Sequence, residues 1–288
     1  MNAIVLAAGT ASRFVPLSFE KPKGLLEVKG EILIERQIRQ LKEAKINDIT
    51  VVVGYKSNLF NYLSQKYGVN LVFNDDYNRY NNTSSLIRVL DRLDNTLICC
   101  SDHYYLNNVF LDIDSNNSYY ATQFSKGNTN EWCVSIDEDD SIKSISVGGA
   151  NAWYLAGYAS LNSCFSKSFK RILSREYFQG DARYDYWETV WVSHLQELPM
   201  KIRKYETNDI KEFDSLDDLR SFDNSYNNNT RSSIIKTISL KLSCKEGDLH
   251  SFMLINNSEN DLVFSFMHEG QRLIYHHNTR SIHINDND

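Results

Sequence analysis

The sequence is poor in the residues that mark disordered, collagen-like or disulfide-linked chains. Its 288 residues include only 3 prolines and 12 glycines, and 42% are hydrophobic, which is the composition of a folded globular protein. The five cysteines form no C-x-x-C pair, and no basic, apolar leader opens the chain. These features predict a reduced, cytoplasmic protein.

Long apolar runs and an excess of positive charge are also missing. No run approaches the roughly 18 to 20 residues that a membrane-spanning helix needs, so we expect no membrane partner. Lysine and arginine total 31 against 37 for aspartate and glutamate, a net charge of −6. No global positive field therefore favours nucleic acid, and any phosphate site must be local.

The first hundred residues alternate short apolar runs with amphipathic segments. This alternation predicts an α/β fold with a mostly parallel central sheet and flanking helices. The ligand crevice of such a sheet lies at the carboxyl ends of its strands, where Gly9, Gly54 and Asp102 fall. Strands are predicted at 3–8, 49–53, 70–73 and 96–100, and helices at 32–44, 59–67 and 84–93.

Beyond residue 118 the pattern becomes rich in β-type segments. Strands are predicted at 119–124, 132–136, 142–147 and 153–161, and helices at 165–177 and 186–195. A polar stretch at 224–230 lacks periodicity and predicts a linker. We therefore expect a domain at 1–223, a linker at 224–232 and a small α+β appendage at 233–288.

The strongest local signal is the loop that follows the first strand. A strand that ends in small residues lets a ligand approach the backbone closely, and the N–H groups of the turn can hold phosphate. Arg13 and Lys23 add positive charge beside it. The alternative is a merely tight strand-to-loop connection. The predicted nucleotide-binding residues of this loop are Leu6, Ala7, Ala8, Gly9, Thr10, Ala11, Arg13 and Lys23.

Two further groups of polar residues are candidates for ligand binding. Asn82 and Ser84 precede a predicted helix and can hydrogen-bond a nucleotide, although helix capping explains them equally well. The other group combines aromatic rings with carboxylates, the combination that recognises a quaternary ammonium, which cannot donate N–H hydrogen bonds. Ordinary packing is the alternative for each ring. The members of the group are Glu131, Trp132, Tyr154, Tyr186, Trp187 and Glu188.

The loop residues resemble the motifs L-A-A-G-x-G-x-R and K-P-K-x-L-L of the nucleotidyltransferase superfamily. They stand here as Leu6 to Arg13 and Lys21 to Leu26, with Ala11 where many members have glycine. The resemblance extends to segments 51–55, 80–86, 101–104, 130–132 and 212–215. Over about residues 1–223 the chain resembles the bacterial CTP:phosphocholine cytidylyltransferases, including versions fused to a choline kinase.

This resemblance implies a Rossmann-like nucleotidyltransferase fold that binds CTP and phosphocholine and releases CDP-choline and pyrophosphate. Arg13 and Lys23 would be the catalytic residues, because they stabilise charge on the phosphates. Asp102 and Asp214 would hold Mg²⁺, with Glu212 as a weaker candidate, although each aspartate taken alone is more typical of a turn or a helix cap. Trp132, Tyr186 and Trp187 would lie near the choline headgroup.

Alternatives remain open at this point. The acceptor could be 2-aminoethylphosphonate or a sugar-1-phosphate, or the chain could be an inactive, nucleotide-binding regulatory module. Residues 233–283 resemble the start of the kinase lobe, but they contain no H-x-D-x-x-x-x-N loop, so kinase activity is not expected. The preference for cytosine over uracil rests on the resemblance alone.

Overall fold

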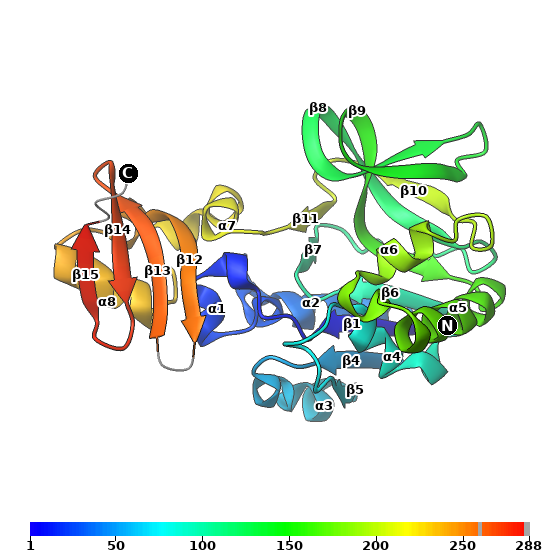
Figure 1. Ribbon diagram of the computed structural model, residues 1–288, viewed down its shortest axis with the longest axis horizontal. Coiled ribbons are helices and arrows are strands. Elements are labelled where there is room, and N and C mark those ends of the chain that lie inside the picture. The colour runs from blue at the N-terminus through cyan, green and yellow to red at the C-terminus, as the bar shows by residue number, and fades with distance from the viewer. Residues whose placement is uncertain (259–260, 285–288) are drawn as a thin grey trace. The chain divides into compact units, whose positions relative to one another are not determined.

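The computed structural model describes residues 1–258 and 261–284 (Figure 1). Two compact units form the chain, and each is assembled from two separate segments. The first unit comprises Met1–Gly9 and Leu33–Glu212, and the second comprises Thr10–Ile32 and Phe213–Asp288. This division differs from the expected boundary near residue 225, because the loop after the first strand joins the C-terminal part of the chain.

A seven-stranded sheet forms the centre of the first unit. Strand β1 (Asn2–Ala7) lies inside the sheet and pairs in parallel with β4 (Ile49–Val53) and β6 (Thr96–Cys100), with Val5 opposite Val51 and Cys99. The β4–β5 and β10–β8 pairs are also parallel, whereas β9 runs antiparallel to β6 and β8. The mostly parallel sheet that the sequence predicted is therefore confirmed. Its order is β10 (Lys201–Tyr205), β8 (Tyr119–Ile136), β9 (Ile142–Leu161), β6 (Thr96–Cys100), β1 (Asn2–Ala7), β4 (Ile49–Val53) and β5 (Asn70–Phe73).

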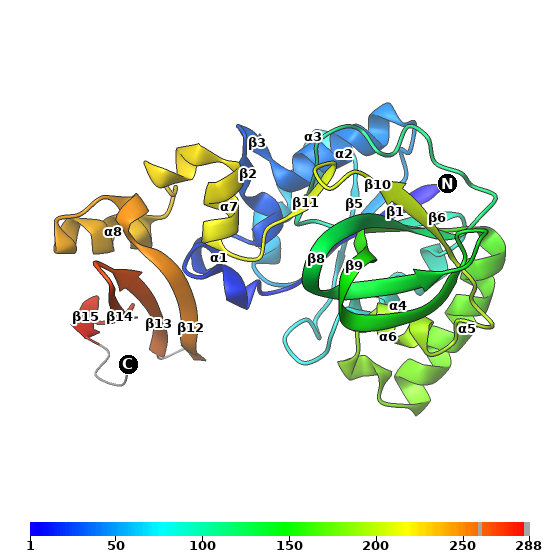
Figure 2. The same cartoon turned by 90° about the horizontal axis from the view of Figure 1, so that it is seen from above.

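Helices cover both faces of this sheet. Figure 2 shows α2 (Leu33–Glu43) and α3 (Tyr62–Tyr67) on one side of β1, and α4 (Thr83–Ile87), α5 (Ser163–Gln179) and α6 (Trp187–Val192) on the other. The core includes Ile4 and Ile98 of the sheet together with Phe169, Ile172 and Leu173 of α5. Removing these apolar side chains from water is the main force that holds α5 against the sheet.

Two predicted helices are shorter than expected. The segment 59–67 contains a 3₁₀ helix, η3 (Ser57–Phe60), before α3, and 84–93 contains α4 followed by η4 (Leu90–Arg92). Helix α3 ends at Gly68, which adopts a left-handed conformation with φ of 64°. Short 3₁₀ turns of this kind are frequent at helix ends.

The four predicted strands between 119 and 161 are two long strands, β8 and β9. Their antiparallel pairing continues through several register shifts, and Gly127 and Asn151 take positive φ where the sequence indicated breaks. The acidic turn between the strands is closed by Asp137, whose carboxylate accepts hydrogen bonds from the N–H groups of Asp139 and Ser141. The predicted breaks are therefore bulges within continuous strands.

The second unit combines the N-terminal loop with a small α+β region. The loop contains η1 (Ser12–Phe14), α1 (Leu17–Glu20), η2 (Lys23–Leu25) and the hairpin of β2 (Glu27–Val28) and β3 (Glu31–Ile32). The C-terminal segment contains α7 (Leu216–Phe222), η6 (Asn224–Asn227), α8 (Ser233–Leu242), η7 (Glu246–Asp248) and an antiparallel sheet of β12 (His250–Ser258), β13 (Asp261–His268), β14 (Gln271–His276) and β15 (Ser281–Ile284). The remaining short strands, β7 (His103–Tyr105) and β11 (Ile210–Glu212), pair with each other in the first unit.

Residues 224–232, expected to be a linker, are packed into the second unit. Tyr226 and Thr230 are buried, and Tyr226 donates a hydrogen bond of 2.7 Å to the carbonyl of Glu27. The N–H and hydroxyl of Thr230 both donate to Glu246, each at 2.6 Å. The segment is therefore anchored through its few buried residues, while its asparagines face solvent. The expected resemblance of residues 233–283 to a kinase lobe stays a prediction.

None of the helices within residues 1–258 and 261–284 combines the length and the apolar character that crossing a membrane requires.

Candidate active site

The predicted phosphate-binding motif is divided between the two units. Leu6 and Ala7 end β1 in the first unit, and Thr10 begins the loop of the second. Beside the strand end, the Tyr55 N–H donates a 3.0 Å hydrogen bond to the Ala8 carbonyl. A side chain on Gly54 would place its Cβ 2.6 Å from Tyr77 and 2.9 Å from that same carbonyl. Glycine is therefore required at position 54 by close packing.

Ala11 occupies a left-handed conformation, with φ of 50° and ψ of 48°. Glycine adopts this region without steric cost, whereas an alanine pays about 1 kcal/mol or more through contact between its Cβ and the backbone. The superfamily motif has glycine at this position. Ala11 replaces that glycine, but its backbone keeps the conformation that glycine favours. The loop therefore keeps its conformation under local strain.

Asp214 connects the two predicted catalytic cations within the second unit. Its carboxylate lies 2.9 Å from Nη1 of Arg13 and 3.6 Å from Nζ of Lys23. The side chain of Lys23 is only 12% exposed and that of Arg13 is 75% exposed. Lys23 also lies over the ring of Phe14, 5.9 Å from its centroid. Because a shielded charge acts through a lower effective dielectric constant, Lys23 has the stronger electrostatic influence of the two cations.

A second group of possible ligand atoms lies in the first unit, where β6 ends. Cys100, Asp102 and His103 each offer one atom, and the three atoms lie within 4.8 Å of one another. Pairing of β11 with β7 sets Glu212 opposite His103, with 3.4 Å between His103 Nε2 and Glu212 Oε2. Burial, followed by the charges of Asp102, Glu188 and Glu212, raises the pKa of the Cys100 thiol. This part of the unit therefore carries a concentrated negative potential.

The three atoms of Cys100, Asp102 and His103 lie close enough together to share a divalent cation, and Glu212 adds a carboxylate beside His103. Carboxylate oxygens such as that of Asp102 are the ligands that Mg²⁺ prefers. Glu212, the weaker candidate in the sequence, thus lies in the same unit as Asp102. Asp214 belongs to the other unit and forms the ion pairs described above.

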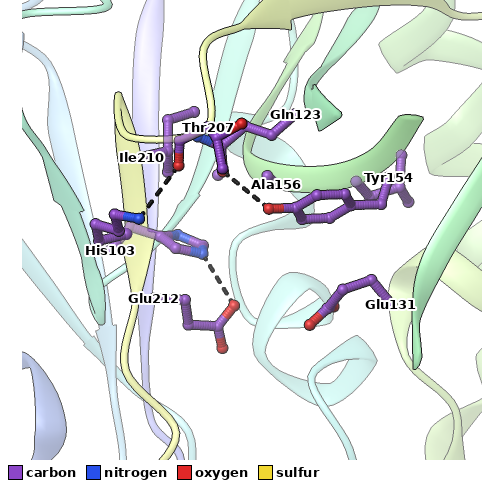
Figure 3. A pocket seen from close by; sticks show the side chains of 11 residues that line it. His103, Gln123, Glu131, Tyr154, Ala156, Thr207, Ile210 and Glu212 are labelled. Carbon is purple, nitrogen blue, oxygen red and sulfur yellow. Dashed lines mark hydrogen bonds and ion pairs between the residues drawn. The ribbon is translucent and has the colours of Figure 1, made fainter. Parts of the chain in front are cut away.

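A cavity of about 210 Å³ adjoins this group (Figure 3). The carboxyl groups of Glu131 and Glu212 point into the space next to the ring of Tyr154 (Figure 3). The Tyr154 hydroxyl donates a 3.2 Å hydrogen bond to the amide oxygen of Gln123. The lining is completed by His103, Leu155, Ala156, Gly157, Thr207, Ile210 and Lys211. Acidic and aromatic groups facing one cavity can bind a small organic cation.

Trp132 and Tyr186 come together from distant parts of the sequence. Their ring centroids lie 6.3 Å apart in an edge-to-face arrangement, with Trp132 on β8 and Tyr186 at the N-cap of α6. Tyr186 is half exposed, so one ring face is open to a ligand. The structure therefore brings together two of the three rings expected near the headgroup.

Trp187, the third ring, is a core residue. It is 1% exposed and stacks on Tyr120 at 5.9 Å and on Trp191 at 6.3 Å between centroids. Phe169 of α5 contacts it edge-on at 5.7 Å. Trp187 therefore packs in the core, which is the alternative that the sequence left open. We leave it out of the proposed ligand site.

The carboxylate of Glu188 is held by two hydrogen bonds. Tyr120 donates to its Oε1 at 3.2 Å, and Asn82 donates to its Oε2 at 3.3 Å. Burial raises the pKa of Glu188 to about 7; the hydrogen bonds oppose this rise, and the charge of Glu212 adds to it. The carboxyl group therefore titrates near neutral pH.

Asn82 and Ser84 have structural partners. The side-chain oxygen of Asn82 accepts a 2.7 Å hydrogen bond from the N–H of Trp187, at the start of α6. Ser84 is fully buried, donates to the Asn81 carbonyl at 2.7 Å and accepts from Asn74 at 2.8 Å. Both residues fix the backbone around the site, but neither caps α4, whose N-terminus has no side-chain cap hydrogen bond.

Sequence reasoning missed Gln123 and Cys100 as parts of the site. Gln123 is 2% exposed in the middle of β8, and a buried amide in a sheet must find hydrogen-bond partners. Cys100 is the last residue of β6, and the turn that follows brings its sulfur close to the Asp102 carboxylate. A polar residue within an otherwise buried strand was the available signal in both cases.

Comparison with known proteins places these features in a family. Residues 3–113 match the model of the MobA-like NTP transferase domain. The chain is 35% identical over 223 residues to the choline-phosphate cytidylyltransferase of Streptococcus pneumoniae, covering 77% of this chain and 97% of that protein. It is 33% identical over 229 residues to the 2-aminoethylphosphonate cytidylyltransferase of Lancefieldella rimae, covering 78% and 93%.

A solved structure of the CTP:phosphocholine cytidylyltransferase from Streptococcus pneumoniae matches with a TM-score of 0.73 and 36% identity, over 76% of this chain and 96% of that one. The fold and the site therefore define a nucleotidyltransferase. Within that class, the chain belongs to the family of the bacterial choline-phosphate cytidylyltransferases. The family predicted from the sequence motifs is confirmed. Nucleotidyltransferases of this family generally use divalent metal ions.

Proposed function

We propose that the chain transfers the cytidylyl group of CTP to phosphocholine. An oxygen of the phosphocholine phosphate attacks the α-phosphorus of CTP and forms a new P–O bond. The bond from the α-phosphorus to the β-phosphate oxygen breaks, and its electron pair leaves with pyrophosphate. CDP-choline is the other product.

The acidic and aromatic cavity of the first unit is the observation that carries the proposal. Glu131 and Glu212 supply negative charge, and Tyr154 supplies an aromatic ring. A trimethylammonium group has no N–H to donate, so charge and ring faces are the contacts it can make. The ring pair of Trp132 and Tyr186 offers a second aromatic surface of the same kind.

Catalysis by this chain would consist of positioning and charge neutralisation. Arg13 and Lys23, which pair with Asp214 here, would turn to the phosphates of CTP and stabilise the charge that develops on the leaving pyrophosphate. The attacking phosphate is already ionised at neutral pH, so the reaction requires no general base. His103 would therefore orient Glu212 rather than move a proton.

Mg²⁺ is the ion that we propose for this site. When bound, it would supply positive charge to the phosphate oxygens. Asp102 and Glu212 would hold it from the first unit, and Asp214 is a proposed ligand from the second. Nucleoside triphosphates are made and used inside the cell, so we place the reaction in the cytoplasm.

The acceptor 2-aminoethylphosphonate is a second candidate. The relative from Lancefieldella rimae that bears this substrate in its name is 33% identical over 78% of this chain. A primary ammonium donates three hydrogen bonds, and the carboxylates and the Gln123 amide of the cavity can accept them. The cavity therefore offers hydrogen-bond acceptors for 2-aminoethylphosphonate as well as an aromatic ring for phosphocholine.

Pyrophosphate release measured with Mg²⁺ distinguishes these functions. The assay combines CTP, UTP, ATP and GTP, each in turn, with phosphocholine, 2-aminoethylphosphonate and glucose-1-phosphate. We expect release with CTP and phosphocholine, at a kcat/KM well above that of every other pair. Preference for 2-aminoethylphosphonate would replace the acceptor, and no release with any pair would refute the transferase assignment.

A further inference from the structure

The C-terminal segment of the second unit holds the N-terminal loop at α1. Ser233, the first residue of α8, donates its N–H to Oε1 of Glu20 at 2.8 Å, and its hydroxyl donates to the same oxygen. A carboxylate at a helix N-terminus satisfies free N–H groups and interacts favourably with the helix dipole. Phe19 adds an apolar contact, with 6.2 Å between its ring centroid and that of the fully buried Phe264.

A second attachment lies on the other side of Lys23. Arg231 pairs with the carboxylate of Glu27 at 3.2 Å, and Tyr226 donates to the carbonyl of the same residue at 2.7 Å. Two residues after Glu27, the N–H of Lys29 donates a 2.8 Å hydrogen bond to the carboxylate of Asp223. The loop is therefore fixed both before and after the cation that faces Asp214.

The similarity to the cytidylyltransferases accounts for only part of this chain. The matches to the cytidylyltransferases span nearly all of those proteins but only about three quarters of this chain. Helix α8 and strands β12–β15 follow the last elements of the first unit along the chain, and β12 contacts η1, which carries Arg13. The C-terminal segment therefore contacts the loop 10–32 at several points, and these contacts can influence the conformation of the loop.

We propose that the C-terminal segment 223–284 acts as a clamp that keeps the loop 10–32 in the conformation required to bind the nucleotide. Glu20 and Ser233 are positioning residues, because they act on the phosphates only through the loop. The inference rests on the proposed function for the roles of Arg13 and Lys23. A released loop must be ordered again whenever CTP binds, so loosening the clamp weakens CTP binding and leaves phosphocholine binding unchanged.

The substitution Ser233→Pro tests the clamp without breaking the helix. Proline lacks both donors to Glu20, and it is favoured at the first position of a helix. The preceding residue, Ser232, has φ of −106° and ψ of 122°, the extended conformation that a following proline prefers. Ser163→Pro is the matched control, because Ser163 is exposed, begins α5 and follows the extended Asn162 in the first unit.

Hydrogen exchange followed by mass spectrometry measures the clamp directly. Two hydrogen bonds to a partly exposed carboxylate predict that Ser233→Pro speeds exchange of residues 10–32 by about tenfold. Exchange of β4 and β6 should stay as in the wild type. Ser163→Pro should leave the loop unchanged, and Ser233→Thr, which retains both donors, should restore wild-type exchange.

Steady-state kinetics then test the role of the clamp in binding. Ser233→Pro should raise KM for CTP by about tenfold, with KM for phosphocholine unchanged. Unchanged exchange in the loop overturns the clamp, and faster exchange with an unchanged KM for CTP overturns its role in nucleotide binding. A wild-type protein without transferase activity refutes the proposed function instead; the exchange experiment and the Kd for CTP, measured by calorimetry, then decide the clamp.

Discussion

Replacing Lys23 with alanine tests the electrostatic part of the proposed mechanism. The Lys23 side chain is 12% exposed and its Nζ lies 3.6 Å from the Asp214 carboxylate, so the charge acts in a shielded setting. A unit charge at roughly 4 Å from a developing charge contributes about 4 kcal/mol at an intermediate dielectric constant, or about three powers of ten in rate. Water that enters the space left by the side chain would replace part of this electrostatic stabilisation. We therefore expect kcat to fall by about 10²–10³.

The assay is steady-state pyrophosphate release with saturating CTP and phosphocholine. Lys167→Ala, an exposed lysine on α5, controls for the general effect of losing a surface charge and should leave kcat unchanged. Arg13→Ala should lower kcat less than Lys23→Ala, because the Arg13 side chain is 75% exposed and its charge is screened by water. A fall of less than about threefold for Lys23→Ala would contradict the reasoning, as would a larger effect at Arg13.

Three further predictions test other parts of the structure. Ala11→Gly should stabilise the protein against urea by up to about 1 kcal/mol, because glycine removes the strain of the left-handed backbone; an unchanged or lower midpoint contradicts this. The free energy of unfolding should rise as pH falls from about 8 to about 6, because burial raises the pKa of Glu188 to about 7 and the folded protein therefore binds a proton that the unfolded chain releases; Glu188→Gln should remove this part of the dependence, and identical profiles for the two proteins would contradict the raised pKa. Trp187→Ala should cost about 3–5 kcal/mol of unfolding free energy, whereas Trp132→Ala should mainly raise KM for phosphocholine; equal losses of stability would refute the distinction between the two rings.

The strands of the central sheet were predictable because their signal is local. Strands β4 and β6 are short apolar runs bounded by glycine or polar residues, and they begin and end where expected. The separation of β8 into two predicted strands failed because bulges leave polar residues within a continuous strand.

Within the site, the sequence identified residue types better than their partners. The cationic loop was recognisable because its residues are adjacent in the chain. The core position of Trp187 depends on Tyr120 and Phe169, which are distant in sequence, and no local pattern separates a buried ring from a binding ring. The same reason explains residues 224–232, whose partners Glu27 and Glu246 lie outside the segment.

The two-part composition of each unit also affects how the chain can fold during synthesis. Residues 10–32 leave the ribosome long before residues 213–284, which complete their unit, while everything needed for the first unit lies before residue 213. Contacts between such distant segments form late, because closing a long loop costs entropy before the contacts compensate for it. The sheet can therefore assemble while the chain is still growing, and the loop that carries Arg13 and Lys23 reaches its native contacts only after the C-terminal strands have emerged. Residues 213–284 thus decide when the chain becomes competent to bind its nucleotide.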